Sequence, residues 1–281
     1  MIETMSVKFE HKDCAQLLQE LQTNSVELVV TSPPYFNARD YSQYRSVADY
    51  MAQMKVIFEQ CFRVLKESRM CIVNISPVLV ERAKRSEQSY RIPLPFYYVP
   101  MMEQLGFEFL EDIIWKKPDG AAANRNGGFN VHRKPVAYKP NIVTEYVLVF
   151  KKKAPFLIDK VLQNHSLVEG DYERTNVWEI NPETNSWHPA PFPDELVGKL
   201  VRYYSYEGET VLDPFTGSGT TAKVCIRLNR KFVGAEMKAE YFNKTAKALR
   251  DELSKLSLFP NAFEKGEGSV GQKINTNSSA A

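Results

Sequence analysis

The sequence lacks several features that would assign a protein class at once. No apolar run approaches the roughly 18 residues that a membrane-spanning helix needs. The chain does not open with a basic segment followed by an apolar one, so no secretory signal and no export are expected. With 43% hydrophobic and 25% charged residues, a wholly disordered chain is also excluded. We therefore expect a folded protein with a large core.

Cysteine is scarce and scattered. The four cysteines, Cys14, Cys61, Cys71 and Cys225, show no CxxC spacing. This argues against a zinc ribbon, a thioredoxin-like site and a disulfide framework. We predict buried free thiols and no metal site.

An excess of one charge is missing from the chain as a whole. Its 36 basic and 34 acidic residues leave a net charge of only +2. The stretch from Lys116 to Lys153 differs, because it has nine Lys or Arg against two acids, a local charge of 9 − 2 = +7. This indicates a local positive surface.

Two hydrophobic periods alternate along the chain. Short β-branched runs predict strands at Val26–Val30, Met70–Ile75, Thr144–Phe150, Thr210–Phe215 and Lys231–Met237. Stripes at helical spacing separate several of these runs. This order predicts an α/β fold: an open, mostly parallel sheet with helices on both faces.

The predicted domain covers residues 1–256. Two segments inside it, around 116–140 and 151–187, fit neither period and are expected to form long functional loops or a small inserted module. Residues 257–281 are polar and have few large apolar side chains, which predicts a flexible tail.

A glycine-rich segment, DPFTGSGTTA at 213–222, follows one of the predicted strands. Gly217 and Gly219 allow a tight turn and a close approach to a ligand, and the next helix offers free N–H groups. Glu236 ends the next predicted strand, 17 residues after Gly219, where a carboxylate can accept hydrogen bonds from ribose hydroxyls. The pattern predicts an adenosine-containing cofactor.

Asp213 favours one such cofactor over another. A carboxylate at the strand end would repel a pyrophosphate but attract the α-amino group of a methionine moiety. S-adenosylmethionine is therefore favoured, while NAD remains open at this point because its sites use similar glycines.

A second segment, TSPPY at 31–35, follows the apolar strand Val26–Val30. Its prolines stop the strand and hold the backbone rigid. Ser32 Oγ and the Pro33 carbonyl would offer two acceptors to one amino group, beside the stacking face of Tyr35. These groups suit an exocyclic base amine, but on this segment alone an ordinary Pro-Pro turn is the favoured interpretation.

Together, TSPPY and DPFTGSGTT resemble the two hallmark motifs of the amino-group DNA methyltransferases. Their order, catalytic turn first, resembles the circularly permuted β group of that family. VWEI at 177–180 and HPAPFPDEL at 188–196 are similar to segments that precede the cofactor turn in this group. The resemblance covers most of residues 6–256.

The resemblance implies roles for individual residues. The implied catalytic residues are Ser32, Pro33, Pro34 and Tyr35. The implied residues for S-adenosylmethionine are Asp13, Thr31, Phe192, Asp213, Pro214, Phe215, Gly217, Ser218, Gly219, Thr220 and Glu236. Permutation places VKFEHKDC at the position of the strand after Glu236, so Asp13 would hold the adenine amino group; it also suits a helix N-cap. The expected DNA contacts are Lys116, Lys117, Arg125, Arg133, Lys134 and Lys139.

The implied reaction is methyl transfer to an exocyclic amine of a flipped-out base in duplex DNA, by direct in-line attack. Ser32 in place of Asp is associated with N4 of cytosine, and N6 of adenine is the alternative. The partner is double-stranded DNA in the cytoplasm of a prokaryote or phage host. A cognate restriction endonuclease and a homodimer are left open.

Other chemistries fit less well. Methylation at carbon 5 of cytosine would need a nucleophilic Cys after Pro, and no cysteine follows proline. Zinc deaminases need HxE with PCxxC, which the chain lacks. RNA and protein-glutamine methyltransferases usually place the two turns in the opposite order. An inactive nucleic-acid-binding protein of the same fold remains an alternative.

Overall fold

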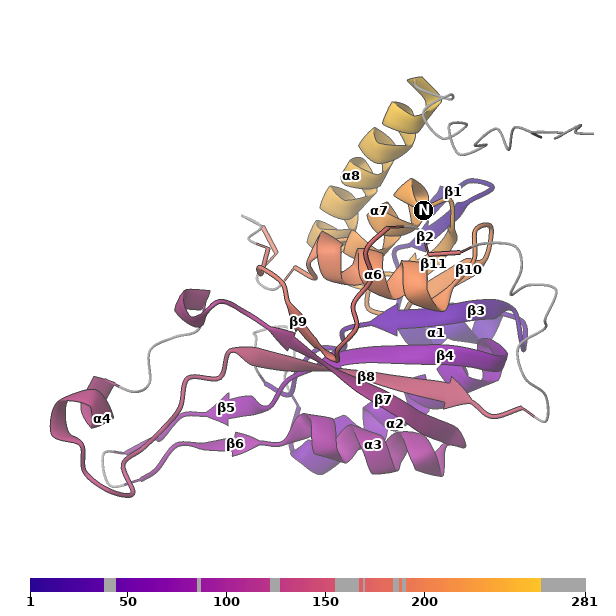
Figure 1. Ribbon diagram of the computed structural model, residues 1–281. Helices are drawn as coiled ribbons and strands as arrows, with labels where there is room; N and C mark the ends of the chain where they lie inside the picture. Colours follow the sequence, from indigo (N-terminus) through magenta and orange to yellow (C-terminus); the bar gives the residue numbers. More distant parts are fainter. Residues whose placement is uncertain are drawn as a thin grey trace, which may run out of the picture.

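A nine-stranded sheet organises the computed structural model, which describes residues 1–37, 44–84, 87–121, 127–154, 167–168, 170–183, 187–188 and 191–258 (Figure 1). Its strands, in chain order, are β1 (Ile2–Glu3), β2 (Val7–Glu10), β3 (Val26–Thr31), β4 (Leu65–Ile75), β7 (Phe107–Lys116), β8 (Thr144–Lys152), β9 (Val177–Glu179), β10 (Thr210–Asp213) and β11 (Lys231–Ala235). Across the sheet the order is β1-β2-β11-β10-β3-β4-β8-β7-β9.

The five adjacent strands β2, β11, β10, β3 and β4 run parallel to one another. Strand β8 lies between β4 and β7 and is antiparallel to both. The predicted open, mostly parallel sheet is therefore confirmed. The N-terminal strand β2 pairs with β11, the position that a permuted chain requires.

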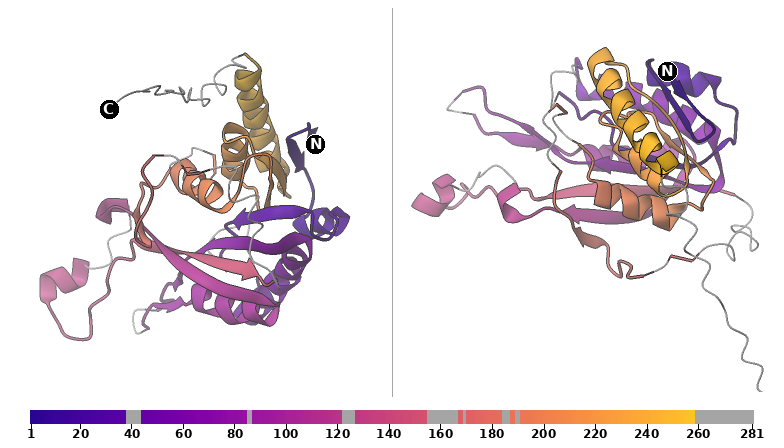
Figure 2. Two further views of the ribbon diagram at one scale, coloured as in Figure 1. Left: turned by 45° about the vertical axis from the view of Figure 1, so that its right-hand side comes forward. Right: turned by 90° about the horizontal axis from the view of Figure 1, so that it is seen from above.

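Helices cover both faces of the sheet because each carries one apolar stripe (Figure 2). In α2, Tyr50, Met54, Phe58 and Cys61 recur at helical spacing and are buried. Burial of each such side chain stabilises the fold by about 1.5–3 kcal/mol. One face holds α1 (Cys14–Glu20), α2 (Val47–Val64) and α3 (Leu94–Gln104). The other holds α6 (Asp194–Tyr204), α7 (Thr220–Arg227) and α8 (Ala239–Leu258).

The cysteines lie inside these layers. All four are buried free thiols, as predicted from their scattered spacing. Burial raises the pKa of the Cys14 thiol to about 12, with Asp13 beside it adding to the effect. The thiols are therefore protonated and act as small apolar groups.

Smaller elements project beyond the sheet. A separate hairpin is formed by β5 (Val78–Val80) and β6 (Tyr90–Ile92). The segment between β7 and β8 holds the short helix η1 (Asp119–Ala121) and α4 (Gly127–His132). We call residues 127–143 the arm; Figure 1 shows the arm and the hairpin extending from the same end of the sheet.

The segments expected as loops or an inserted module are partly regular. The first contains α4, and the second contains the edge strand β9, which pairs with the end of β7 through Trp115 and Trp178. Residues 259–281, which include nearly all of the expected tail, lie outside the described residues. Among the described helices, none is long and apolar enough to cross a membrane.

Candidate active site

The two motif turns meet at the carboxyl ends of neighbouring strands. Strands β3 and β10 pair through Leu28 with Val211 and Val29 with Leu212. At their ends the Thr31 hydroxyl donates a 2.7 Å hydrogen bond to Asp213 Oδ1, and both side chains are buried. Residues 182 positions apart are therefore in direct contact, and the turns that follow them begin at one point of the sheet.

Asp213 holds the glycine-rich turn together. Its Oδ2 accepts a 2.8 Å hydrogen bond from the Thr221 hydroxyl, and its Oδ1 accepts one of 3.1 Å from the Phe215 amide. Burial raises the pKa of Asp213 to about 6, although the hydrogen bonds from Thr31, Thr221 and Phe215 oppose this shift. A cationic ligand beside this carboxylate would favour its ionised form and so offset the effect of burial.

The turn itself requires glycine at two positions. Gly217 and Gly219 have φ angles of +50° and +76°, in the left-handed region that other residues rarely adopt. A Cβ on Gly219 would lie 2.5 Å from Thr245 Cγ2. The Thr245 hydroxyl also donates a 2.7 Å hydrogen bond to the Gly217 carbonyl. α8 therefore packs directly against the turn, which leads into α7.

Two further carboxylates follow the next strands of the sheet. Glu236, after β11, accepts hydrogen bonds from the Gly217 amide at 3.1 Å and the Lys238 amide at 2.8 Å. Burial raises the pKa of Glu236, while these two amides lower it. Asp13, after β2, accepts a 2.7 Å hydrogen bond from the Ala15 amide. Its expected role as the N-cap of α1 is therefore confirmed.

The chemistry of this group fits a cationic ligand with vicinal hydroxyls. Asp213 ends β10, and Glu236 and Asp13 follow β11 and β2; these three strands are neighbours in the sheet. Carboxylates at these positions attract positive charge and accept hydrogen bonds from hydroxyl groups. Phe192 is half-buried against the cluster on the α6–α8 face. Pro214, Phe215, Ser218 and Thr220 belong to the same turn, where Ser218 and Thr220 share a 3.3 Å hydrogen bond.

The Pro-Pro turn, Ser32 to Tyr35, follows the end of β3, directly after the residue that contacts Asp213. Pro33 is buried, whereas Ser32, Pro34 and Tyr35 are half-buried. The Ser32 hydroxyl donates a 3.3 Å hydrogen bond to the Asn74 carbonyl. The Tyr35 hydroxyl donates one of 2.7 Å to Glu145 Oε2. Ser32 and Tyr35, on either side of the two prolines, thus have defined hydrogen-bond partners.

Three residues of this site had not been predicted as its members. Asn74, near the end of β4, donates from Nδ2 to Glu145 Oε2 at 2.7 Å and to the Tyr35 hydroxyl at 3.1 Å. Lys117 forms an ion pair with Glu145. The sequence shows only that Glu145 lies at the start of the predicted strand Thr144–Phe150, and this does not give the direction of that strand in the sheet.

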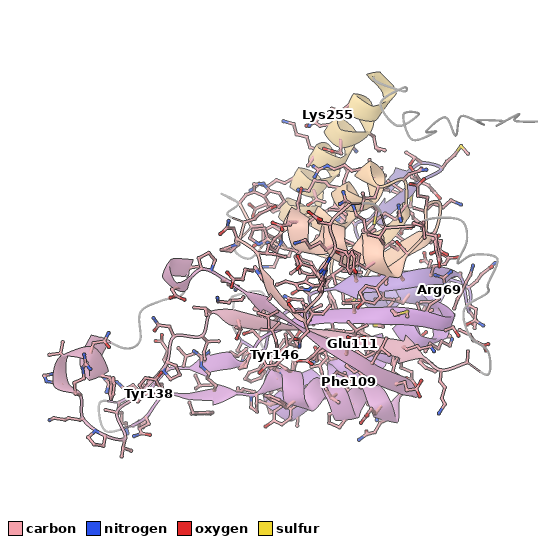
Figure 3. All side chains as sticks on the ribbon, in the orientation of Figure 1. Arg69, Phe109, Glu111, Tyr138, Tyr146 and Lys255 are labelled. Atoms are coloured by element: carbon pink, nitrogen blue, oxygen red, sulfur yellow. The ribbon has the colours of Figure 1, made fainter. Side chains whose placement is uncertain are left out.

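The basic residues expected to contact DNA fall into two groups. Lys116 pairs with Glu179 at 2.7 Å, and Lys117 pairs with Glu145. Arg133, Lys134 and Lys139 lie on the arm, and Arg125 lies outside the described residues. Figure 3 shows Tyr138 of the arm on the far side of the molecule from Arg69. The arm extends from the end of the sheet that carries the two turns.

Comparison with known proteins identifies relatives of this chain. A family model described as DNA methylase (N6_N4_Mtase) matches residues 26–247. The type II beta methyltransferase M.BslI of Bacillus sp. (strain NEB-606) is 31% identical over 246 residues, which cover 84% of this chain and 26% of that protein. The type II methyltransferase M.BglII of Bacillus subtilis is 29% identical over 270 residues, covering 90% and 72%. The chain thus spans about a quarter of the first relative and most of the second.

Solved structures with a similar fold include TTHA0409 of Thermus thermophilus, assigned as a DNA modification methylase and crystallised with S-adenosyl-L-methionine. Its TM-score is 0.71 at 27% identity, with 87% of this chain and 93% of that chain covered. PvuII DNA methyltransferase, described as cytosine-N4-specific, has a TM-score of 0.65 at 20% identity and covers 90% and 93%. The second likeness concerns the fold alone.

Proposed function

This chain belongs to the N6/N4 DNA methylase family, and from that premise we propose that it methylates the N4 amine of cytosine at a specific site in duplex DNA. DNA methyl transfer with S-adenosylmethionine as donor is the activity of the family. The choice of cytosine, the roles of individual residues and the site specificity are our proposal.

The observation that carries the proposal is the hydrogen bond between Thr31 and Asp213. It joins the turn that offers acceptors, at Ser32 and Pro33, to the turn rich in glycine, at Gly217 and Gly219. Group transfer between two bound molecules needs the reacting atoms to be held close together in a fixed orientation. Two binding turns that start at one point of the sheet meet this requirement.

The glycine-rich turn and its carboxylates fit S-adenosylmethionine. When bound, this cofactor supplies a methyl group on a positively charged sulfur. We assign Asp213 to the charge of its methionine part, Glu236 to its ribose hydroxyls and Asp13 to its adenine amine. Phe192 would line the methionine end. Gly217 and Gly219 are required for the shape of this turn, because any side chain there would meet His188 or Thr245.

The Pro-Pro turn fits the amine. An amine on an aromatic base is a poor nucleophile because its lone pair is delocalised into the ring. Ser32 Oγ donates its one proton to the main-chain carbonyl of Asn74 and accepts a 3.5 Å hydrogen bond from Asn74 Nδ2, so its second lone pair can accept from an N–H group of the amine. A second N–H would bind the Pro33 carbonyl. The two hydrogen bonds would turn the nitrogen lone pair toward the methyl group, and the Tyr35 ring would stack on the base.

The target base must leave the duplex to reach this turn, because its amine is otherwise paired. The arm supports the DNA contact: Arg133 and Lys134 are exposed there, and residues 127–143 contain no acidic residue. Lys139 donates a 3.1 Å hydrogen bond to Ser89, beside the β5–β6 hairpin. Lys116 and Lys117 already face carboxylates, so a phosphate would compete with an ion pair at each.

The experiment that tests the proposal identifies the modified nucleoside. The full chain is incubated with unmethylated phage DNA and isotopically labelled S-adenosylmethionine, and the digested DNA is examined by mass spectrometry. N4-methylcytosine is the expected product, because the resemblance associates Ser32 in place of Asp with cytosine. N6-methyladenine would overturn the choice of base. No labelled nucleoside, with cofactor binding intact, would favour an inactive DNA-binding protein.

A further inference from the structure

A buried polar cluster lies directly behind the Pro-Pro turn. It joins Tyr35, Asn74, Glu145 and Lys117, which come from four separate stretches of chain. Asn74 is 3% exposed, and the side chains of Glu145 and Lys117 are 13% and 22% exposed. We call these four residues the Glu145 cluster.

The topology of the sheet explains how the cluster assembles. Strand β8 is antiparallel to β4 and β7, so its first residues lie beside the last residues of both neighbours. In the pairing of β7 with β8, Glu145 lies opposite Trp115, and Lys117 is two residues after Trp115 in the sequence. A carboxylate from the start of one strand therefore reaches the same edge as the turn after β3.

Glu145 is the centre of the cluster. Its Oε2 accepts from the Tyr35 hydroxyl and from Asn74 Nδ2, both at 2.7 Å. Its Oε1 faces the Lys117 ammonium, which also lies 4.5 Å from the centroid of the Trp115 ring. A largely buried carboxylate needs such a counter-charge and such donors. Both oxygens of Glu145 are thereby bound by groups from other strands.

The cluster fixes the orientation of the Tyr35 ring. The phenol oxygen donates to Glu145 and accepts from Asn74 Nδ2 at 3.1 Å. Burial, with Glu145 alongside, raises the pKa of Tyr35 well above its ordinary value, so the hydroxyl keeps its proton and remains a donor. Rotation of the ring would break two hydrogen bonds in a site from which water is largely excluded.

The cluster also reaches Ser32 through Asn74. The Asn74 side chain donates a 3.5 Å hydrogen bond from Nδ2 to Ser32 Oγ. The Ser32 hydroxyl in turn donates, at 3.3 Å, to the main-chain carbonyl of Asn74, which is held by β4 itself. Among the described residues, Asn74 Oδ1 is buried without a hydrogen-bond partner. The orientation of the Asn74 side chain is therefore set by the hydrogen bonds that Nδ2 donates to Glu145 and Tyr35. In this orientation the side-chain oxygen makes no hydrogen bond to the described residues.

We propose that Glu145, neutralised by Lys117, is a positioning residue of the methyl-transfer reaction: it holds the Tyr35 ring directly and the Ser32 hydroxyl through Asn74. The proposal rests on the function proposed above for the Pro-Pro turn. Glu145 touches no reacting atom and acts entirely through these three residues. Its effect is on the rate of the chemical step, because misplacement of reacting groups by about 1 Å can cost about 100-fold.

The test compares Glu145→Gln, Tyr35→Phe and the double variant in single-turnover methyl transfer to unmethylated phage DNA. Glutamine keeps the size of the side chain but loses the charge, and phenylalanine keeps the ring but loses the hydroxyl. Each single variant should slow transfer by about 10- to 100-fold. Cofactor affinity, measured by calorimetry, should change less than about twofold. Because both changes break the same link, the double variant should be little slower than the slower single variant.

The matched control is Glu179→Gln. Glu179 also pairs with a lysine, Lys116, one strand pair away at the same edge, but it is 72% exposed and touches neither Tyr35 nor Ser32. At saturating DNA, where any change in the DNA affinity of Lys116 no longer affects the rate, the control should transfer the methyl group as fast as wild type. A purely structural role for Glu145 would lower the melting temperature and cofactor affinity together, and it would leave the Tyr35→Phe effect additive.

The outcomes separate the two proposals. If the wild-type protein methylates DNA while Glu145→Gln keeps its full rate, or if the effects of the two single variants multiply, the positioning role is overturned and the proposed function stands. If the wild-type protein binds S-adenosylmethionine but transfers no methyl group to DNA, both proposals fall. Tyr35→Phe, which removes only one oxygen atom and leaves the Glu145–Lys117 pair intact, provides the test if Glu145→Gln does not fold.

Discussion

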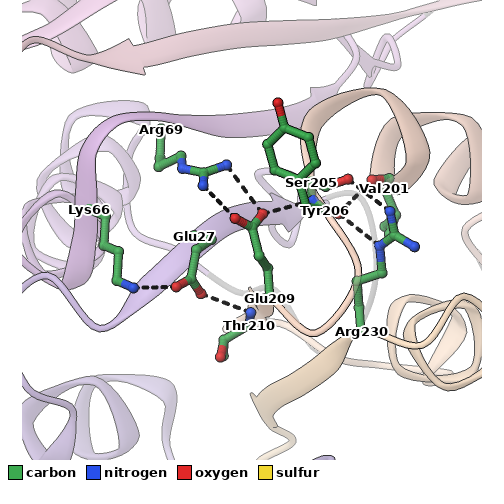
Figure 4. Close-up of polar contacts among 9 residues, drawn as sticks. All are labelled: Glu27, Lys66, Arg69, Val201, Ser205, Tyr206, Glu209, Thr210 and Arg230. Atoms are coloured by element: carbon green, nitrogen blue, oxygen red, sulfur yellow. Dashed lines mark hydrogen bonds and ion pairs between the residues drawn. The ribbon is translucent and has the colours of Figure 1, made fainter. Parts of the chain in front are cut away.

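The two ends of the central sheet both hold buried polar groups, but they differ in how completely those groups are satisfied. At the amino ends of β3, β4 and β10, Arg69 pairs with Glu209, and Glu27 accepts from Lys66 and the Thr210 amide (Figure 4). At the carboxyl ends, Asn74 Oδ1 has no partner among the described residues. Burial there also raises the pKa of Asp213 to about 6.

We infer that the polar groups at the amino ends of the strands stabilise the fold, whereas those at the carboxyl ends serve binding and catalysis. At the amino end, Arg69 binds both oxygens of Glu209, and Glu209 also accepts from the Tyr206 amide at 2.8 Å. Because both oxygens of Glu209 already have partners, this network links neighbouring strands and leaves neither oxygen free to bind a ligand. At the carboxyl end, carboxylates with raised pKa values, and an amide oxygen without a partner among the described residues, are typical of a site that is completed by binding.

The largest expected effect is on the rate at the carboxyl end. Ser32→Ala removes one acceptor for the amine and should slow single-turnover methyl transfer by about 100- to 1,000-fold, the usual effect of losing one preorganised hydrogen bond. Cofactor affinity and the melting temperature should stay near wild type. Retention of the full rate would show that Ser32 is not an acceptor in the reaction.

At the amino ends of the strands we expect a substitution to lower stability and to leave the rate of methyl transfer unchanged. Arg69→Met leaves Glu209 buried without its cation and should lower the free energy of unfolding, measured in urea, by about 3 kcal/mol. The transfer rate per folded molecule should not change. Lys255→Met is the control, because Lys255 is 71% exposed and lies far from Arg69 on α8 (Figure 3). Equal stability of the two variants would contradict the distinction.

Two glycines with the same backbone conformation sharpen the comparison. Gly208, before β10, has φ +77° and open space around it, whereas Gly219 has φ +76° and Thr245 in contact. Both Ala variants should lose about 1 kcal/mol from left-handed strain, and Gly219→Ala should lose about 1–3 kcal/mol more from overpacking. Gly219→Ala alone should weaken cofactor binding in calorimetry. Weaker cofactor binding by Gly208→Ala would show that the effect is not local to the turn.

The raised pKa of Asp213 predicts a pH dependence of cofactor binding. A cationic ligand favours the ionised carboxylate, so binding must displace a proton when the pH is below about 6. The dissociation constant should therefore rise about tenfold per pH unit below 6 and be flat above it. In Asp213→Asn the affinity should be lower throughout, with less change across this window. Since Glu236 also has a raised pKa, the difference between the two proteins is the informative quantity.

The smallest effect concerns DNA affinity. Lys134→Ala, on the arm, should reduce the slope of log binding constant against log salt by about 1. Lys153, at the amino-end edge of the sheet after β8, is the matched control because it is also exposed. An unchanged slope for Lys134→Ala, or an equal loss for Lys153→Ala, would place the DNA surface elsewhere.

The strands that frame the site could be predicted because they are short apolar runs bounded by turn residues. Val26–Val30 and Thr210–Phe215 were expected as strands, and both are followed by the motifs that meet in the structure. Strand β7 and helix α3 were missed: β7 is largely exposed on one face, and Pro100 interrupts the pattern of α3.

The Glu145 cluster could not be predicted for a different reason. Because β8 is antiparallel to its neighbours, its first residues, and not its last, lie beside the Pro-Pro turn. The hydrophobic pattern of a strand does not show in which direction the strand runs in the sheet. Lys117 was expected on a DNA-binding surface because local charge was the only available signal. Its ion pair with Glu145 depends on which strands lie side by side in the sheet, and the sequence pattern does not show this.

The most direct test of the account is a crystal structure of the full chain with S-adenosylmethionine. We predict that the cofactor lies against Gly217 and Glu236 and that its methyl group faces the turn of Ser32 and Tyr35. A cofactor bound away from the Thr31–Asp213 contact, or with its methyl group turned from Ser32, would contradict the claim that the two turns form one active site.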